Sequence, residues 1–160
     1  MKSSKIRFGV IGCSRVAKKS FLPAIRDSDK AEIGMIGSRS KEKAMEYCKS
    51  FGCSSYGNYE DVVRNENIDV VYVSLPVGMH DEWAIKAAEA GKHVLCEKSS
   101  TTSLESAKRM VAACKKNNVR LLEGFMFRYH PQHQKVMSMI REEVLGKLLM
   151  FQGHFGLPFP

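Results

Sequence analysis

Short apolar runs alternate with helix-spaced segments along most of the chain, and residues that favour turns bound each run. The run over residues 68–75 is rich in Val and Tyr and almost continuously apolar, as a strand covered on both faces requires. We expect a strand at each such run. These strands cover residues 6–11, 33–37, 54–56, 68–75, 93–96 and 119–124.

Helical spacing fills the intervals between the apolar runs. Helices are expected over residues 41–51 and 80–90, each of which is followed by a glycine. Thr102 and Glu105 have the spacing of a capping box and would open a further helix. Its apolar side would consist of Leu104, Ala107, Val111 and Cys114. Strands that alternate with such helices predict an α/β fold with an open, doubly wound parallel sheet, which binds ligands at the carboxyl ends of its strands.

The pattern changes toward the end of the chain. A helix is expected over residues 132–144, and a strand over residues 148–155 follows it. We therefore divide the chain into a first domain, residues 1–124, and the start of an incomplete α+β domain, residues 125–160. The strand over residues 148–155 would expose an unpaired edge, so we expect the chain to associate unless a partner covers that edge.

Composition and charge narrow the class of protein. Of the 160 residues, 44% are hydrophobic and 26% are charged, and the formal net charge is +8. The lysines and arginines are scattered and often lie beside acids, so we expect no nucleic-acid partner. No run approaches the length of a membrane span, so no membrane partner is expected.

The cysteines argue against a disulfide framework and against a zinc site. They are Cys13, Cys48, Cys53, Cys96 and Cys114. Their number is odd and no two of them form a Cys-x-x-Cys pair, which favours a reducing, cytoplasmic location. His130 and His133 lack a third ligand nearby, so no metal is expected there.

The turn after the first apolar run has the pattern of a dinucleotide fingerprint, Gly-x-Gly-x-x-Gly/Ala. Gly12 and Ala17 fit this pattern, and Ser14 replaces the middle glycine with a small residue whose hydroxyl can donate to phosphate. The free N–H groups and dipole of the following helix would complete an anion site, and the fold would then be of the Rossmann type. The candidate cofactor-binding residues of this turn are Gly12, Cys13, Ser14, Arg15 and Val16. An ordinary strand–helix turn is the alternative.

The second apolar run ends without the acid that binds the ribose 2′-hydroxyl of NAD. Ser38, Arg39 and Lys41 follow it instead. Hydroxyls and cations suit the 2′-phosphate of NADP, because guanidinium pairs with phosphate through charged hydrogen bonds. We therefore expect NADP or NAD as the cofactor, with NADP favoured. Alternatively, Arg39 only stacks on adenine, or the serines only cap the next helix.

Two later segments carry a more specific pattern. They are GKHVLCEK at residues 91–98 and EGFMFRYHP at residues 123–131. Together with Leu75-Pro76 and His80, they resemble the Gfo/Idh/MocA family, which comprises glucose-fructose oxidoreductase, inositol dehydrogenase and their relatives. The resemblance extends from Lys5 to the end of the chain.

This resemblance implies catalytic roles for Lys98 and Glu97. In the family the lysine lies beside the nicotinamide and the reacting hydroxyl, so Lys98 would orient the substrate and help to move its proton. Glu97 would contact the cofactor ribose or position Lys98. Proline usually follows this pair in the family, often in a cis peptide, whereas this chain has Ser99. The alternative is a surface Glu–Lys pair that follows a strand.

The resemblance also implies further contacts with the cofactor. Leu75 and Pro76 correspond to the loop that passes under it. His80 matches a family histidine at the start of the following helix, and Arg128 matches an arginine that reaches toward the cofactor or active site. As alternatives, His80 is a helix-cap or packing residue, and Arg128 forms an interdomain salt bridge.

The implied reaction is hydride transfer between the nicotinamide and a secondary alcohol or ketone of a sugar, polyol or nucleotide sugar, a step of carbohydrate metabolism. Family members are longer, and their larger second domain forms the substrate pocket and the homo-oligomer interface. We therefore expect these 160 residues alone to bind the cofactor without turnover. The alternative is a non-catalytic dinucleotide-binding module that serves as a sensor, a partner or a truncated relic.

Overall fold

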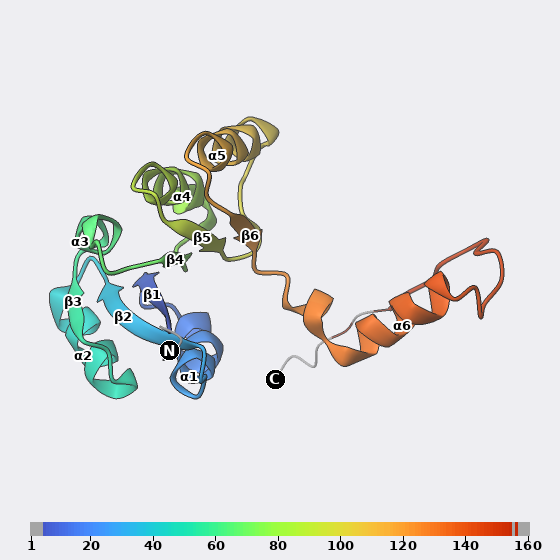
Figure 1. Ribbon diagram of the computed structural model, residues 1–160, viewed down its shortest axis with the longest axis horizontal. Helices are drawn as coiled ribbons and strands as arrows, with labels where there is room; N and C mark the ends of the chain where they lie inside the picture. Colours follow the sequence, from blue (N-terminus) through green and yellow to red (C-terminus); the bar gives the residue numbers. More distant parts are fainter. Residues whose placement is uncertain (1–4, 155, 157–160) are drawn as a thin grey trace. The chain divides into compact units, whose positions relative to one another are not determined.

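The computed structural model describes residues 5–154 and residue 156 (Figure 1). The chain separates into two compact units, residues 1–124 and residues 125–160. Each unit has its own secondary structure, and each is described by itself.

The first unit is built on a parallel sheet of six strands in the order β3-β2-β1-β4-β5-β6. The strands are β1 (Ile6–Ile11), β2 (Ala31–Gly37), β3 (Ser55–Gly57), β4 (Val70–Val73), β5 (His93–Cys96) and β6 (Leu121–Glu123). The predicted α/β fold with a doubly wound parallel sheet is therefore confirmed. β4 is shorter than its apolar run, because Ser74 already leaves the sheet and begins a loop.

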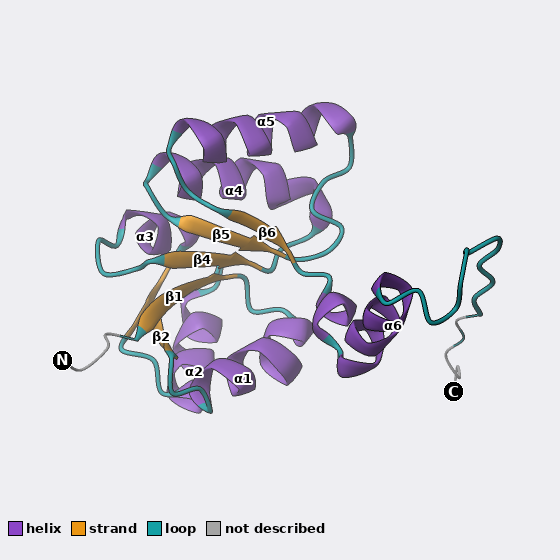
Figure 2. Ribbon diagram, turned by 45° about the vertical axis from the view of Figure 1, so that its right-hand side comes forward, coloured by secondary structure: helices purple, strands orange, loops and turns teal. Residues whose placement is uncertain are grey.

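Helices cover both faces of this sheet (Figure 2). One face carries η1 (Ala17–Phe21), α1 (Leu22–Arg26) and α2 (Lys41–Phe51). The other face carries α3 (Tyr59–Arg64), α4 (His80–Glu89) and α5 (Leu104–Lys116), with the short helix η2 (Val77–Met79) leading into α4. In the part of the chain that the structure describes, no helix has the length and apolar character to cross a membrane.

Two hydrophobic cores form because successive strand residues point to opposite faces. Val10 and Tyr72 belong to the core under α1 and α2, whereas their neighbours Ile11 and Val73 belong to the core under α3, α4 and α5. All four are almost completely buried. Each fully buried aliphatic side chain contributes about 1.5–3 kcal/mol relative to an exposed one, so burial of the central strands on both faces dominates the stability of the sheet.

Polar side chains cap the helices that precede and follow β3 in the sequence. The Ser40 side chain accepts from the Lys43 N–H at 3.2 Å and starts α2, which ends where Gly52 adopts a φ of +71°. Asn58 and Asp61 form a reciprocal capping box that starts α3. The sequence reasoning missed α3, because a helix of six residues offers too few turns for apolar periodicity to show.

The prediction for α5 was wrong in two respects. Its N-cap is Ser103, whose side chain accepts from the Ser106 N–H at 3.1 Å, so the capping box assigned to Thr102 and Glu105 is not formed. The buried stripe consists of Ser106, Met110 and Cys114. Of the predicted apolar face, Leu104 is 64% exposed and Val111 is 43% exposed. Because Ser106 is polar, the hydrophobicity pattern of the sequence does not reveal this buried stripe.

The second unit contains η3 (Met126–Tyr129) and α6 (Pro131–Arg141), and the His130 side chain caps α6 by accepting from the Gln132 N–H. The strand predicted over residues 148–155 is absent from residues 148–154, and residue 155 lies outside the described part. A strand needs a neighbour to pair its backbone, and the described residues of this unit provide none. The exposed strand edge expected there is therefore absent from residues 148–154 as well.

A disulfide joins Cys48 in α2 to Cys53, contrary to the expectation from cysteine spacing. The turn at Gly52 brings the two residues together, because the N–H groups of Gly52 and Cys53 both donate to the Cys48 carbonyl. Cys13, Cys96 and Cys114 are free. The Cys-x-x-Cys rule considers only cysteines with two residues between them, so it does not detect Cys48 and Cys53, which the turn at the end of α2 brings together.

We expect reduction of this disulfide to lower the free energy of unfolding by about 2 kcal/mol, because a cross-link between residues 48 and 53 restricts only a short loop of the unfolded chain. Urea denaturation with and without dithiothreitol measures the difference. The variant Cys53→Ser should match the reduced natural chain and should not respond to the reductant. Equal stability of the natural chain in both conditions would contradict the assignment.

Candidate cofactor-binding site

The carboxyl ends of the central strands lie in one row. Ile11 pairs with Gly37 and with Val73, and Val73 pairs in turn with Cys96. The residues that follow these positions therefore leave the sheet at the same edge. They are Gly12, Ser38, Ser74 and Glu97. Candidate residues from the sequence lie in the loops after all four of these strands, so the sheet brings them to one edge, as predicted.

A pocket of about 310 Å³ opens at this edge, where the strand order reverses between β1 and β4. Such a switch point is where open α/β sheets bind ligands. The pocket is lined by Gly12, Cys13, Ser14, Ser38, Arg39, Ser40, Lys43, Tyr59, Ser74, Leu75 and Pro76. Seven of these residues, all but Ser40, Lys43, Tyr59 and Ser74, were candidates from the sequence.

Gly12 makes the turn out of β1 possible. Its φ is +100°, and a Cβ atom there would lie 2.4 Å from the Ser74 carbonyl oxygen and 2.9 Å from the Leu75 side chain. Neither the backbone conformation nor the space tolerates a side chain. The chain can therefore turn tightly across the end of β4 and start a helix over the crevice.

Ser14 caps the helix that follows this turn. Its hydroxyl accepts from the Ala17 N–H at 3.0 Å and is hydrogen-bonded to the Ser74 hydroxyl. The sequence reasoning gave this hydroxyl to a phosphate, but in the structure it already has two partners. The first N–H groups of a helix have no partner within the helix, so they are the donors that this turn offers to an anion.

Cys13 is a packing residue within the turn. Burial raises the pKa of its thiol, which favours the neutral form over a reactive thiolate. The Tyr47 hydroxyl donates to the Cys13 carbonyl at 3.2 Å and ties the turn to α2. The sequence did not reveal this role of Tyr47, because the helix pattern does not distinguish a tyrosine that hydrogen-bonds to a loop from one that only packs in the core.

Two cations line the pocket beside the end of β2. Arg39 lies in the loop after Ser38, and Lys43 reaches the pocket from the first turn of α2. No carboxylate is among the lining residues. Lys41 is exposed and does not line the pocket, so the cation next to Arg39 is Lys43. Lys43 lies in the first turn of α2, three residues after the N-cap Ser40, so the predicted start of this helix could have identified it.

The loop that carries Lys98 is anchored by its neighbours. The buried Tyr72 hydroxyl donates to Glu97 Oε1 at 2.6 Å, and the Lys98 N–H donates to Glu97 Oε2 at 3.3 Å. Burial, and secondarily the hydrogen bond to Glu97, raise the pKa of Tyr72, so it remains a donor. The Ser100 N–H donates to Glu123 Oε1 at 2.8 Å. The Lys98 side chain itself is exposed.

Several candidates lie elsewhere. Arg15 and Val16 are exposed at the start of the helix after the turn. His80 is 1% exposed, and both its ring nitrogens contact backbone carbonyls. Arg128 is an exposed residue of η3 in the second unit. Arg15, Val16 and His80 do not line the pocket.

This fold and this edge define a dinucleotide-binding domain of the Rossmann type. Residues 6–125 match the model of the Gfo/Idh/MocA family, described as an oxidoreductase family with an NAD-binding Rossmann fold, and the chain belongs to that family. The resemblance inferred from residues 91–98 and 123–131 is thereby confirmed.

Similar proteins include reductases and dehydrogenases of sugars. A dTDP-3,4-didehydro-2,6-dideoxy-alpha-D-glucose 3-reductase from Actinomadura kijaniata is 38% identical over 98% of this chain and 47% of its own length. A D-xylose 1-dehydrogenase (NADP(+)) from Haloferax volcanii is 33% identical over 96% of the chain and 47% of its own length. The chain thus spans about half the length of these relatives.

Solved structures of the family agree with this fold. A 3-ketoreductase from Actinomadura kijaniata, crystallised with TDP-benzene and NADP, superposes with a TM-score of 0.82 and 39% identity, over 88% of this chain and 45% of the other. The WlbA dehydrogenase from Bordetella pertussis, crystallised with NADH and UDP-GlcNAcA, gives 0.82 and 32% over 92% of this chain and 42% of the other.

We expect Gly12→Ala to destabilise the chain by about 3 kcal/mol or more and to abolish dinucleotide binding, because the new Cβ meets a backbone oxygen. Gly52→Ala is the matched control, since Gly52 also has a positive φ but nothing within 4 Å of its Cβ position. It should cost only the strain of the left-handed backbone, about 1–2 kcal/mol. Urea denaturation measures both variants, and equal losses would refute the role of the close approach.

Proposed function

We propose that this chain binds NADP in the pocket between β1 and β4 and forms the cofactor-binding part of an oxidoreductase acting on a sugar, a polyol or a nucleotide sugar. The observation that carries the proposal is the pocket itself. It combines the Gly12 turn at the switch point with two cations and no lining carboxylate. The functions and bound ligands of the relatives support the same cofactor and substrate class.

The chemistry of the pocket fits the parts of NADP in order. The Gly12 turn and the N–H groups of the helix after Ser14 would hold the pyrophosphate. Arg39 and Lys43 would hold the 2′-phosphate, since both are cations that line the pocket. Leu75 and Pro76 would support the dinucleotide on its way toward β5.

Lys98 and Glu97 are the residues that we propose for the reaction. Bound NADP supplies the nicotinamide that exchanges a hydride with a secondary alcohol or ketone carbon. Lys98 would then orient the substrate hydroxyl and carry its proton, and Glu97 would fix the loop that presents Lys98. The bond from Tyr72 to Glu97 supports this positioning role. We also propose that Arg128 faces the completed active site.

Further family properties belong to the same proposal. We propose a homo-oligomer assembled through the second domain of the whole protein, and a cytoplasmic location. The free thiols of Cys13, Cys96 and Cys114 support a reducing compartment, in which the bond between Cys48 and Cys53 would be reduced.

NADP should bind more tightly than NAD, and Arg39→Ala should remove about 1–3 kcal/mol of this preference, the range for a charge-assisted hydrogen bond. Lys41→Ala is the control, because it removes a cation of the same segment that does not line the pocket. Isothermal titration calorimetry with both cofactors measures the preference. If NADP and NAD bind the natural chain with equal affinity, the assignment of Arg39 is wrong.

The chain by itself should bind the dinucleotide but catalyse little or no hydride transfer. Binding uses groups of the first unit, whereas orientation of a substrate contributes about 7–11 kcal/mol of barrier lowering and needs a closed pocket. Calorimetry and nicotinamide absorbance on one sample, with a panel of sugars and nucleotide sugars, test this expectation. Robust turnover that Lys98→Ala abolishes would show that these residues suffice for the reaction. Absence of cofactor binding by the folded chain would refute the proposed function.

A further inference from the structure

His80 is an almost completely buried ionisable side chain near the site. Its exposed fraction is 1%, although it starts α4 at the edge where the loops gather. The family resemblance implied a cofactor contact, but His80 does not line the pocket. Its ring instead lies between two loops that approach the site from different strands, the loop after β4 and the loop after β5.

Both partners of this ring are hydrogen-bond acceptors. Nε2 lies 2.7 Å from the Leu75 carbonyl oxygen, and Nδ1 lies 3.0 Å from the Ser99 carbonyl oxygen. A neutral imidazole carries a single N–H, and a carbonyl oxygen cannot donate. Both contacts are therefore hydrogen bonds only when the ring carries two protons. In the neutral ring, one nitrogen lone pair faces a carbonyl oxygen.

The two carbonyls belong to the two functional loops. Leu75 lines the proposed cofactor pocket, and Ser99 directly follows Lys98. Because both bonds go to the backbone, they hold the loops themselves. His80 thus spans the distance between the residue that supports the dinucleotide and the residue that we propose to carry the proton.

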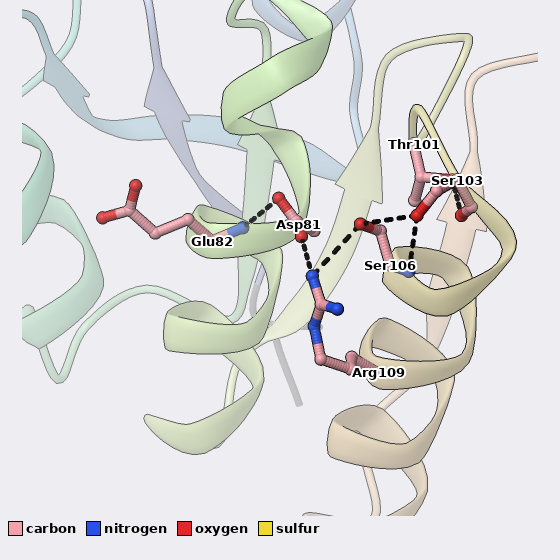
Figure 3. Close-up of polar contacts among 6 residues, drawn as sticks. All are labelled: Asp81, Glu82, Thr101, Ser103, Ser106 and Arg109. Carbon is pink, nitrogen blue, oxygen red and sulfur yellow. Dashed lines mark hydrogen bonds and ion pairs between the residues drawn. The ribbon is translucent and has the colours of Figure 1, made fainter.

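The charged groups around the ring come from each neighbouring element. Asp81 follows His80 in α4, but its carboxylate accepts from Arg109 Nη2 of α5 at 2.6 Å (Figure 3). Burial raises the pKa of Asp81, yet the hydrogen bonds from Arg109 and Ser106 outweigh it and hold the pKa below its ordinary value. Asp81 is therefore an anion already engaged with α5.

The remaining charges belong to the loop after β5 and to β6. Glu97 is bound by Tyr72, Lys98 is exposed, and Glu123 accepts from the Ser100 N–H. The Leu75 and Ser99 carbonyls are therefore the polar partners of the ring in the described structure.

We propose that His80 is a positioning residue which, as an imidazolium, joins the Leu75 loop to the Lys98 loop and releases the Lys98 loop when it loses one proton. The remaining N–H stays with Leu75, because that contact is the shorter of the two. The inference rests on the proposed function for the meaning of Lys98. Under this proposal, the placement of Lys98 depends on pH, whereas the binding of the dinucleotide does not.

The protonation of His80 is measured on the natural chain without cofactor. Long-range proton–nitrogen NMR spectra from about pH 5 to about pH 8, the range over which imidazole changes charge, report whether each ring nitrogen bears a proton. Two protonated nitrogens at the acidic end and one at the basic end are expected. A single protonated nitrogen throughout this range, in folded protein, would overturn the proposal without any variant.

The release of the loop is measured at the Ser100 amide, which donates to Glu123 one residue beyond the bond from His80. Its hydrogen-exchange protection should fall about tenfold as the ring loses its proton, the effect of one lost hydrogen bond. His80→Gln retains a single donor position and should show the lower protection at every pH. A Ser100 protection that follows no ring titration would count against the coupling.

His93→Gln is the matched control for loss of a histidine. His93 lies at the opposite, amino-terminal end of β5, where its ring accepts from the Arg120 N–H. This variant should leave the pH dependence of Ser100 unchanged. Calorimetry with NADP on the same samples separates the two ideas: absence of NADP binding refutes the proposed function, whereas the ring and exchange measurements alone decide the role of His80.

Discussion

The close approach of Gly12 to the Ser74 carbonyl is the constraint on which the site depends. β1 and β4 are neighbours at the point where the strand order reverses, and the Ser74 N–H donates to the Ile11 carbonyl while the Gly12 N–H donates to the Gly37 carbonyl. The turn must therefore leave the sheet with no side chain between the two strands. This one position allows the following helix to begin directly after Ser14, a residue that lines the pocket, and the first N–H groups of that helix have no partner within it.

Side chains of the strands and helices hold the loops around this crevice by their backbones. Tyr47 donates to the Cys13 carbonyl, His80 contacts the Leu75 and Ser99 carbonyls, and Glu123 accepts from the Ser100 N–H. Each bond satisfies a polar group that would otherwise be costly to bury, and it also fixes a loop. The loops of the site therefore owe their positions to rigid elements, which is the condition for a preorganised site.

The parallel sheet could be predicted because continuous apolarity over residues 68–75 and glycines after the helices are local signals. The same local signals predicted Gly12, Ser38 and Arg39, which follow directly after strands. Contacts across the fold could not be predicted in this way. The bond from Tyr72 to Glu97 joins residues far apart in sequence, and the tyrosine resembles any other buried residue of a strand. The strand predicted over residues 148–155 is absent from residues 148–154, because apolar residues do not form a strand without a neighbour to pair with.

Lys98 combines an anchored backbone with an exposed side chain. The fold therefore fixes the loop but not the Lys98 amine. The loop is held through Glu97, Ser99 and Ser100 from three different elements. The described residues form no ion pair with the Lys98 amine. The fold of the first unit therefore fixes the backbone of Lys98 and leaves its side chain in solvent, where it is accessible to a ligand.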